Sequence, residues 1–171
     1  LPEFLDCQEF VNADEIARGL SPFRPEKVAV EAGRIMLNRV NDLLARGETF
    51  AIETTLATKV YQQKIRAAQQ QGYTTTLLYF WLSSPELAQA RVEIRVKEGG
   101  HNIPSEVIER RYWQGLKLLF DLYLPLVDRA LVFNNSDGRP VLLAEKSPGG
   151  FRINNGLYQQ LRNQYESKKA I

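Results

Sequence analysis

The sequence is poor in the side chains that form disulfides and bind transition metals. Its 171 residues include one cysteine, Cys7, and one histidine, His101. A single cysteine excludes an internal disulfide framework and is typical of a reducing compartment. A single histidine excludes a His/Cys zinc cluster and disfavours an ordinary Ser-His-Asp triad. We therefore expect a cytoplasmic protein with no protein-held metal site.

Long apolar runs and one-sided charge are also missing. The longest apolar run, near Thr76–Leu82, is too short to span a bilayer, and no signal-peptide pattern opens the chain. The net charge is +2 and the basic residues are dispersed, which does not predict a nucleic-acid-binding patch. We expect neither a membrane nor a nucleic acid as partner. The hydrophobic content of 44% is enough for one domain over residues 1–171.

What the sequence does contain is a regular alternation of strand and helix patterns. The expected strands are 8–13, 48–54, 73–82, 129–134 and 140–146, and the expected helices are 25–46, 59–71, two arms from Pro85 and Pro104, and 157–165. The run 73–82 is typical of a strand buried on both faces. Such alternation predicts an α/β fold with a mainly parallel sheet, in which ligands bind beyond the carboxyl ends of the strands.

The two arms after residue 84 read as a hinged helical hairpin that carries arginines. Ser84 and Pro85 form a helix start, and Gly99-Gly100 interrupts the helix. The arginines are Arg91 and Arg95 on the first arm and Arg110 and Arg111 on the second. Phosphoryl-transfer enzymes close guanidinium groups of this kind on a polyanion, so we predict a lid over about 91–112. A solvated hairpin with ordinary surface arginines remains an open alternative.

Two acidic residues stand at the ends of expected strands. Asp14 could take a proton from a substrate hydroxyl or hold magnesium through water, or it could simply be the N-cap of the next helix. Glu53, with Thr54 and Thr55, could grip a polar substrate or a hydrated cation, or the strand could simply leave the sheet there. Two carboxylates at strand ends favour a shared site.

Two loops offer weaker candidates. His101, next to the glycine hinge, could contact phosphate on closure, or it could face solvent as loop histidines commonly do. Asn134 and Asn135 follow the last parallel strand, where a nucleotide base could bind. The same residues are also ordinary turn residues.

Four segments together resemble the zeta-toxin family of P-loop kinases, in particular its chromosomal branch. They are FVNADEIARGLSP, FAIETTL, ARVEIRVKEGGHNIPSEVIERRY and LVFNNSDG, and they occur in family order within residues 1–146. The resemblance implies a P-loop kinase-like three-layer sandwich. It also implies transfer of the ATP γ-phosphate, with Mg²⁺, to a hydroxyl of a small molecule such as a nucleotide sugar. An antitoxin protein is the implied macromolecular partner.

The resemblance also implies roles for particular residues. Asp14 would be the base, Glu53 with Thr54 and Thr55 would bind the acceptor, and Arg95 would contact the phosphates. The family's second arginine falls near His101 here, so Arg110 or Arg111 would take its role. The expected nucleotide contacts are Arg91, His101, Asn134 and Asn135.

The sequence departs from the family where phosphate should be cradled. The family carries G-x-x-x-x-G-K-[S/T] before the strand that leads to Asp14, and no Gly-Lys-Ser or Gly-Lys-Thr occurs in the 171 residues. We therefore expect an N-terminally incomplete domain that lacks its first strand, or a gap filled by another segment. Direct pairing of strands 48–54 and 73–82 would indicate a rearranged sheet.

Two other functions remain open beside the nucleotide-sugar kinase. One is a truncated or degenerate non-catalytic binding module, and the other is a nucleotide or antibiotic kinase.

Overall fold

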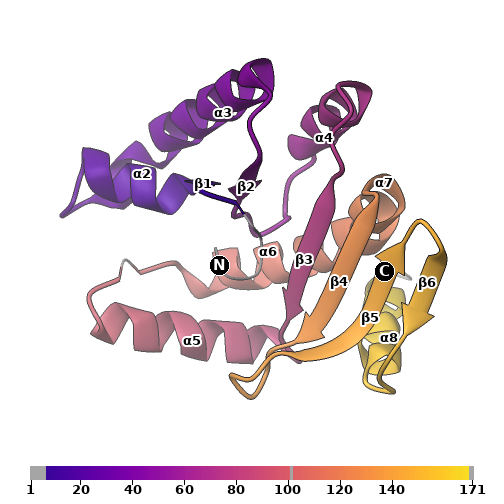
Figure 1. The fold of residues 1–171 in the computed structure, drawn as a ribbon. Helices are drawn as coiled ribbons and strands as arrows, with labels where there is room; N and C mark the ends of the chain where they lie inside the picture. The colour runs from indigo at the N-terminus through magenta and orange to yellow at the C-terminus, as the bar shows by residue number, and fades with distance from the viewer. Residues whose placement is uncertain (1–6, 101, 170–171) are drawn as a thin grey trace. The chain divides into compact units, whose positions relative to one another are not determined.

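The computed structural model describes residues 7–100 and 102–169 (Figure 1). His101 lies outside the described residues. The described chain divides into two compact units, which we treat separately. The N-terminal unit comprises residues 7–54 and 99–100, and the C-terminal unit comprises residues 55–98 and 102–169. The single domain and the lid expected from the sequence remain predictions.

The N-terminal unit contains two short parallel strands and two helices. Its elements are β1 (Glu9–Val11), α2 (Ala13–Leu20), a 3₁₀ turn (Pro25–Val28), α3 (Ala29–Arg46) and β2 (Phe50–Ile52). β1 pairs with β2 in parallel, with Phe10 opposite Ala51. The predicted helix 25–46 is therefore confirmed, although its first turn is 3₁₀. The predicted first strand is too long, because α2 already begins at Ala13.

Helix α3 shows how its sequence pattern sets its buried face. The residues at helical spacing that become buried are Ala32, Met36, Val40, Leu43 and Leu44. Ile35, which the spacing also places near that stripe, is 39% exposed. The helix ends at Gly47, whose φ of 70° is left-handed, and the N–H of Glu48 donates to the carbonyl of Leu43 at 3.1 Å.

The C-terminal unit is built on a four-stranded sheet in the order β3-β4-β5-β6. The strands are β3 (Thr76–Trp81), β4 (Arg129–Asn134), β5 (Val141–Ser147) and β6 (Gly150–Ile153). β3 and β4 are parallel, and β5 and β6 add antiparallel pairs. β3, β4 and β5 correspond to strands that the sequence predicted, whereas β6 was not predicted.

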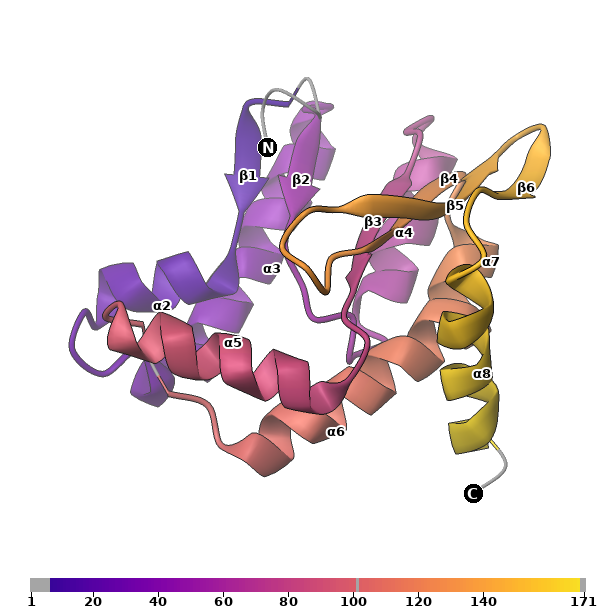
Figure 2. The same cartoon turned by 90° about the horizontal axis from the view of Figure 1, so that it is seen from below.

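The helices of this unit include the predicted hairpin. They are α4 (Tyr61–Gln70), α5 (Pro85–Lys97), α6 (Ser105–Leu118), a π-helical turn (Leu119–Tyr123), α7 (Leu124–Leu126) and α8 (Tyr158–Lys169). Ser84 caps α5 by accepting the N–H of Leu87 at 3.2 Å, as predicted. α5 and α6 run as two adjacent arms (Figure 2).

Strand β3 is buried on one face, which corrects the expectation that both faces would be covered. Trp81 is 2% exposed, whereas its neighbour Phe80 is 45% exposed and stacks on Phe133 of β4 at a ring separation of 5.2 Å. Alternate strand residues point to opposite faces, so these neighbours have different surroundings. On the buried side, desolvation raises the pKa of Tyr79 far above its usual value.

Strands 48–54 and 73–82 do not pair directly with each other. Within the described residues, β2 pairs with β1 alone and β3 with β4 alone. The sheet rearrangement that such pairing would have indicated is therefore not seen.

The loop after β2 packs closely on α6. A Cβ atom added to Gly115 would lie 2.7 Å from the backbone oxygen of Thr55, so glycine is needed at this point of α6. The next loop residue, Leu56, is buried at 4% exposure with a left-handed φ of 60°. A residue other than glycine adopts this φ at a cost in conformational free energy. Burial of the apolar Leu56 side chain offsets this cost.

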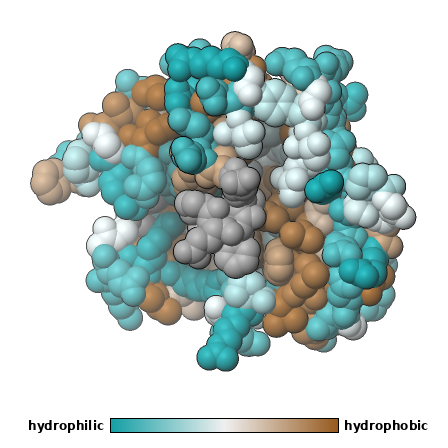
Figure 3. Space-filling view, viewed as in Figure 1, coloured by the Kyte–Doolittle hydropathy of each residue, from teal (hydrophilic) through white to brown (hydrophobic). Residues whose placement is uncertain are grey.

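Several large apolar side chains are exposed. Figure 3 shows polar side chains over much of one face, with apolar ones between them. The most exposed large apolar residue is Phe23, at 96%. No helix in the described part of the chain combines the length and apolarity that a membrane crossing requires.

Candidate functional site

The first site element is the start of helix α2, where Asn12 is the N-cap. Its backbone is extended, with φ −132° and ψ 122°, and its Oδ1 accepts the N–H groups of Asp14 at 2.7 Å and Glu15 at 3.3 Å. Asn12 therefore satisfies two of the donors that a helix start leaves open. The alternative that Asp14 itself is the cap is wrong: Asp14 is the second helical residue.

Glu53 is brought to the same place by the pairing of β1 with β2. The N–H of Glu53 donates to the carbonyl of Val11 at 3.2 Å, which extends the parallel ladder one step beyond β2. The amide Nδ2 of Asn12 then donates to Glu53 Oε2 at 2.7 Å. Two residues that are 41 positions apart in the sequence thus share one charge-assisted hydrogen bond.

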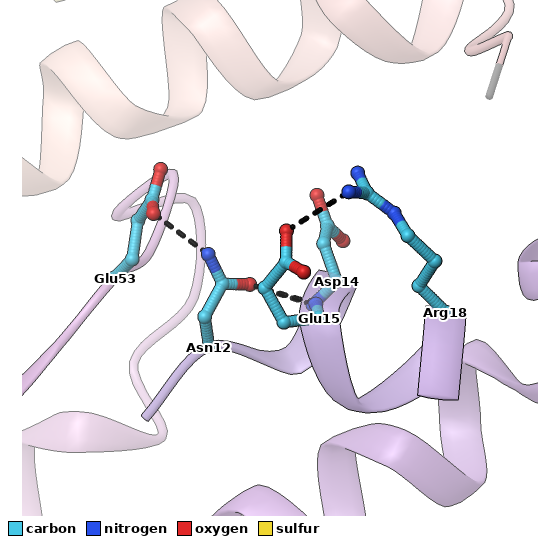
Figure 4. A network of polar contacts seen from close by, with 5 residues as sticks. All are labelled: Asn12, Asp14, Glu15, Arg18 and Glu53. Carbon is cyan, nitrogen blue, oxygen red and sulfur yellow. Dashed lines mark hydrogen bonds and ion pairs between the residues drawn. The ribbon is translucent and has the colours of Figure 1, made fainter. Parts of the chain in front are cut away.

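Asp14 presents a free carboxylate. Its side chain is exposed and has no hydrogen-bond or ion-pair partner among the described residues, whereas neighbouring Glu15 pairs with Arg18 at 3.2 Å. Figure 4 shows the carboxylates of Asp14 and Glu53 pointing to the same side, with Asn12 between them. The structure therefore brings together the two acidic residues that the sequence singled out.

Metal binding by protein side chains alone has no support in the described residues. No group of three or more His, Cys, Asp or Glu side chains lies there with a geometry that could hold a metal ion. The two hydroxyl residues after Glu53 differ: Thr54 is half-buried and Thr55 is exposed. Their expected role in substrate binding remains a prediction.

The second candidate region lies in the C-terminal unit, after β4. Asn134 is 9% exposed, and its Oδ1 accepts both the N–H of Ser136 at 3.0 Å and the hydroxyl of Ser136 at 2.6 Å. The N–H of Asn135 donates to the carbonyl of Trp81 at 2.8 Å. The side-chain oxygen of Asn134 thus closes a turn, and nucleotide binding by this loop remains a prediction.

Arg91 and Arg95 lie one helical turn apart on α5 but differ in their partners. Arg91 donates to the backbone oxygens of Asn135 and Ser136, which fastens α5 to the turn after β4. Arg95 has two buried guanidinium nitrogens, Nε and Nη2, with no hydrogen-bond partner in the described structure. Buried polar atoms are nearly always bonded, which distinguishes Arg95 from Arg91, and the phosphate contact expected of Arg95 remains a prediction.

The second-arm arginines are both exposed on α6. Arg110 lines a pocket of about 350 Å³ together with Trp113, Lys117, Tyr165 and Lys168 of α6 and α8. Arg110 therefore shares a pocket with residues of α8, and no described contact assigns a role to Arg111. The expected phosphate contacts from Arg110, Arg111 and His101 remain predictions.

Sequence reasoning missed the asparagine that links the two acids and a network that ties α8 to the sheet. The indole N–H of Trp81 donates to Tyr112 Oη at 3.2 Å and to Gln164 Oε1 at 3.1 Å. Burial raises the pKa of Tyr112 to about 12. Asn12 had a readable signal, since asparagine before an acidic first helical turn is a preferred cap; its bond to Glu53 had none.

Comparison with known proteins places this chain in a family. The sequence model of the Zeta toxin family matches residues 12–141. An uncharacterized protein of Haemophilus influenzae is 29% identical over 105 residues, which is 61% of this chain and 75% of that protein. A solved chain from the PezAT chromosomal toxin-antitoxin system of Streptococcus pneumoniae superposes with a TM-score of 0.55 at 15% identity, covering 94% of this chain and 74% of that one. The structural likeness shows a mixed α/β fold of the P-loop kinase type, and the family match, which spans more than half of the sequence, shows that the chain belongs to the Zeta toxin family.

Proposed function

We propose that this protein acts as an ATP-dependent kinase that moves the γ-phosphate to a hydroxyl of a small molecule, with a nucleotide sugar as the acceptor class. The observation that carries the proposal is the pair of carboxylates at the ends of β1 and β2. Asp14 is uncommitted, and Glu53 is held through one oxygen by Asn12. Membership of a kinase-like toxin family supports the same reaction.

The chemistry of the acceptor side follows from these side chains. A hydroxyl that attacks a phosphoryl group must lose its proton, and a carboxylate within hydrogen-bond reach can take it. Asp14 is the residue we assign as this base. Glu53 keeps Oε1 available to accept a hydrogen bond from a second acceptor hydroxyl, while Thr54 and Thr55 supply further hydroxyl groups nearby in the chain.

The phosphate side is less complete in this chain. Mg-ATP, when bound, supplies the phosphoryl group and the charge neutralisation by the metal. Arg95 fits one phosphate contact, because its two buried nitrogens need an acceptor. The 171 residues contain no Gly-Lys-Ser or Gly-Lys-Thr, the motif that cradles phosphates in P-loop proteins. We therefore assign only two kinds of role, acceptor contacts to Asp14 and Glu53 and one phosphate contact to Arg95.

We also propose a protein partner of the antitoxin kind. The solved relative comes from a toxin-antitoxin system, and this chain shares its fold. Co-purification of the complete gene product with the product of a neighbouring gene checks this proposal. An active kinase that the products of neighbouring genes neither bind nor inhibit contradicts the proposal.

The test of the kinase proposal is an acceptor screen with radiolabelled ATP and the complete gene product. We expect label to appear on a nucleotide sugar such as UDP-N-acetylglucosamine. Glu53→Gln should raise the acceptor KM and leave the ATP KM unchanged, whereas Glu15→Gln, in the same acidic cluster, should change neither. Absence of transfer to any hydroxyl compound contradicts the proposal, and transfer to a nucleoside or an antibiotic alone redirects the acceptor class.

A second candidate, a binding module without turnover, is favoured by the missing Gly-Lys-Ser/Thr motif. Titration calorimetry of Mg-ATP into the complete gene product separates the two. Undetectable ATP binding together with binding of a nucleotide sugar supports the module. Tight ATP binding counts against it.

A further inference from the structure

We infer that Asn12 is a positioning residue that fixes the spacing between the predicted base and the predicted acceptor-binding carboxylate. The inference deepens the proposed function and rests on it. One side-chain amide serves both elements: its oxygen holds the backbone of Asp14, and its nitrogen holds the carboxylate of Glu53. Both of these bonds are 2.7 Å long.

The oxygen of the Asn12 amide caps α2 and its nitrogen binds Glu53, and a neutral amide can do both. An asparagine side chain carries one acceptor oxygen and one donor nitrogen. An aspartate at position 12 would still cap the helix but would face Glu53 with a second negative charge. A serine would also cap the helix, but its side chain ends one atom earlier and lacks the amide nitrogen. Asparagine is therefore the residue that both caps α2 and binds a carboxylate.

The bond has a consequence for how Glu53 meets a substrate. Glu53 is exposed, so its carboxylate would otherwise sample several rotamers. Donation to Oε2 selects one rotamer and leaves Oε1 for an incoming hydroxyl. Because the same residue fixes the first turn of α2, the carboxyl groups of Asp14 and Glu53 are held by one common support. This arrangement pre-organises the acceptor side before substrate arrives.

The bond itself is testable without any activity. The side-chain amide of Asn12 gives its own pair of NMR signals, and we expect Glu53→Ala in the complete gene product to shift them upfield. Glu15→Gln is the matched control, because Glu15 touches Asn12 through its backbone N–H and should leave the signals in place. Asn12 signals that do not respond to Glu53→Ala overturn the inference, whatever the kinase assay shows.

The positioning role is tested by substitutions at Asn12 that keep the cap. Asn12→Asp and Asn12→Ser should leave the melting temperature close to that of the parent protein. The calorimetric Kd for UDP-N-acetylglucosamine should rise about tenfold or more with Asn12→Asp, since a bond to a charged group is lost. It should rise less with Asn12→Ser, which adds no charge, and ATP affinity should not change in either.

A purely structural Asn12 predicts another pattern. In that case the folded fraction of Asn12→Asp binds the acceptor as the parent does, and this result overturns the inference; a lower melting temperature of Asn12→Ala is expected in both cases. The proposed function fails separately, if the parent protein binds the nucleotide sugar with the predicted dependence on Asn12 but transfers no phosphate to it.

Discussion

Two asparagines at the ends of strands make the same local hydrogen bond but differ in their second partner. Asn12 follows β1 and Asn134 ends β4, and each accepts the N–H of the residue two positions on, Asp14 or Ser136. Asn134 also accepts a hydrogen bond from the hydroxyl of Ser136 and so closes a turn. Asn12 instead donates its second hydrogen bond to Glu53, an acid that follows the neighbouring strand. The contrast separates a turn that supports the fold from a cap that organises a pair of acids.

The arginines of α5 repeat the contrast between satisfied and unsatisfied groups. Arg91 is occupied by the backbone oxygens of Asn135 and Ser136, whereas two nitrogens of Arg95 are buried without a partner among the described residues. A group bonded within the fold stabilises it, whereas we predict that the unbonded nitrogens of Arg95 contact a ligand. Substitutions can therefore tell the two kinds apart.

The largest effect should come from the arginine pair. Arg95→Ala should lower kcat/KM for phosphoryl transfer by about 10²–10³-fold, the usual loss for one transition-state donor, without lowering the melting temperature. Arg91→Ala should do the reverse, with a lower melting temperature and a smaller kinetic loss. Steady-state kinetics and thermal unfolding of the complete gene product measure both. Equal kinetic losses in the two variants break the comparison.

A close backbone approach should give the next largest effect, on stability. Gly115→Ala places a Cβ 2.7 Å from the oxygen of Thr55, a backbone atom that cannot swing away. We expect a loss of about 1–3 kcal/mol in the free energy of unfolding, because the helix must shift. Gly33→Ala, with open space around the added Cβ, is the matched control. Denaturant unfolding of both variants decides the point, and equal stabilities contradict it.

The two asparagines themselves come next. Asn134→Ala leaves the part-buried N–H of Ser136 without its acceptor and should cost about 0.5–1.5 kcal/mol of unfolding free energy. Asn12→Ala removes a helix cap and should cost about 0.5–2 kcal/mol. ATP affinity should be preserved in folded Asn134→Ala. A large loss of ATP affinity at unchanged stability would instead support the nucleotide contact predicted from the sequence.

The smallest effect should be an acid-sensitive contribution from Asp128. Its carboxylate accepts the N–H and the hydroxyl of Thr75, both at 2.7 Å, and these bonds lower its pKa below the ordinary value. The group therefore stabilises the fold above its unfolded pKa, about 3.9, and this stabilisation is lost as the pH falls through the folded pKa. Unfolding free energies measured from pH 7 downward should fall less steeply for Asp128→Asn. If the unfolding free energy of Asp128→Asn falls as steeply with pH as that of the parent protein, Asp128 does not have this role.

Local signals explain the parts of the fold that the sequence predicted. The stripe of α3, its glycine stop at Gly47, the Ser84-Pro85 helix start and strand 129–134 all follow from neighbours along the chain. β6 was missed because a Gly-rich hairpin becomes a strand only by pairing with β5. The exposure of Phe80 was missed because an apolar sequence does not say which faces of a strand are covered.

The residues of the candidate site also fall into those that the sequence predicted and those that it did not. Asp14 and Glu53 were found because each follows a strand, and parallel strands bring their carboxyl ends to one edge. The role of Asn12 was not found, since its bond spans 41 positions and depends on the register of β1 with β2. The difference between Arg91 and Arg95 was likewise invisible, because identical side chains one turn apart differ only in what surrounds them.

The most direct measurement compares two acids of the same helical turn in the complete gene product. Asp14→Asn should lower kcat for phosphoryl transfer by about 10²–10⁴-fold while ATP binding stays measurable, since only the proton acceptor is lost. Glu15→Gln, which removes the pair with Arg18, should keep its turnover. Turnover that survives Asp14→Asn, or that falls equally in both variants, contradicts the assignment of the base.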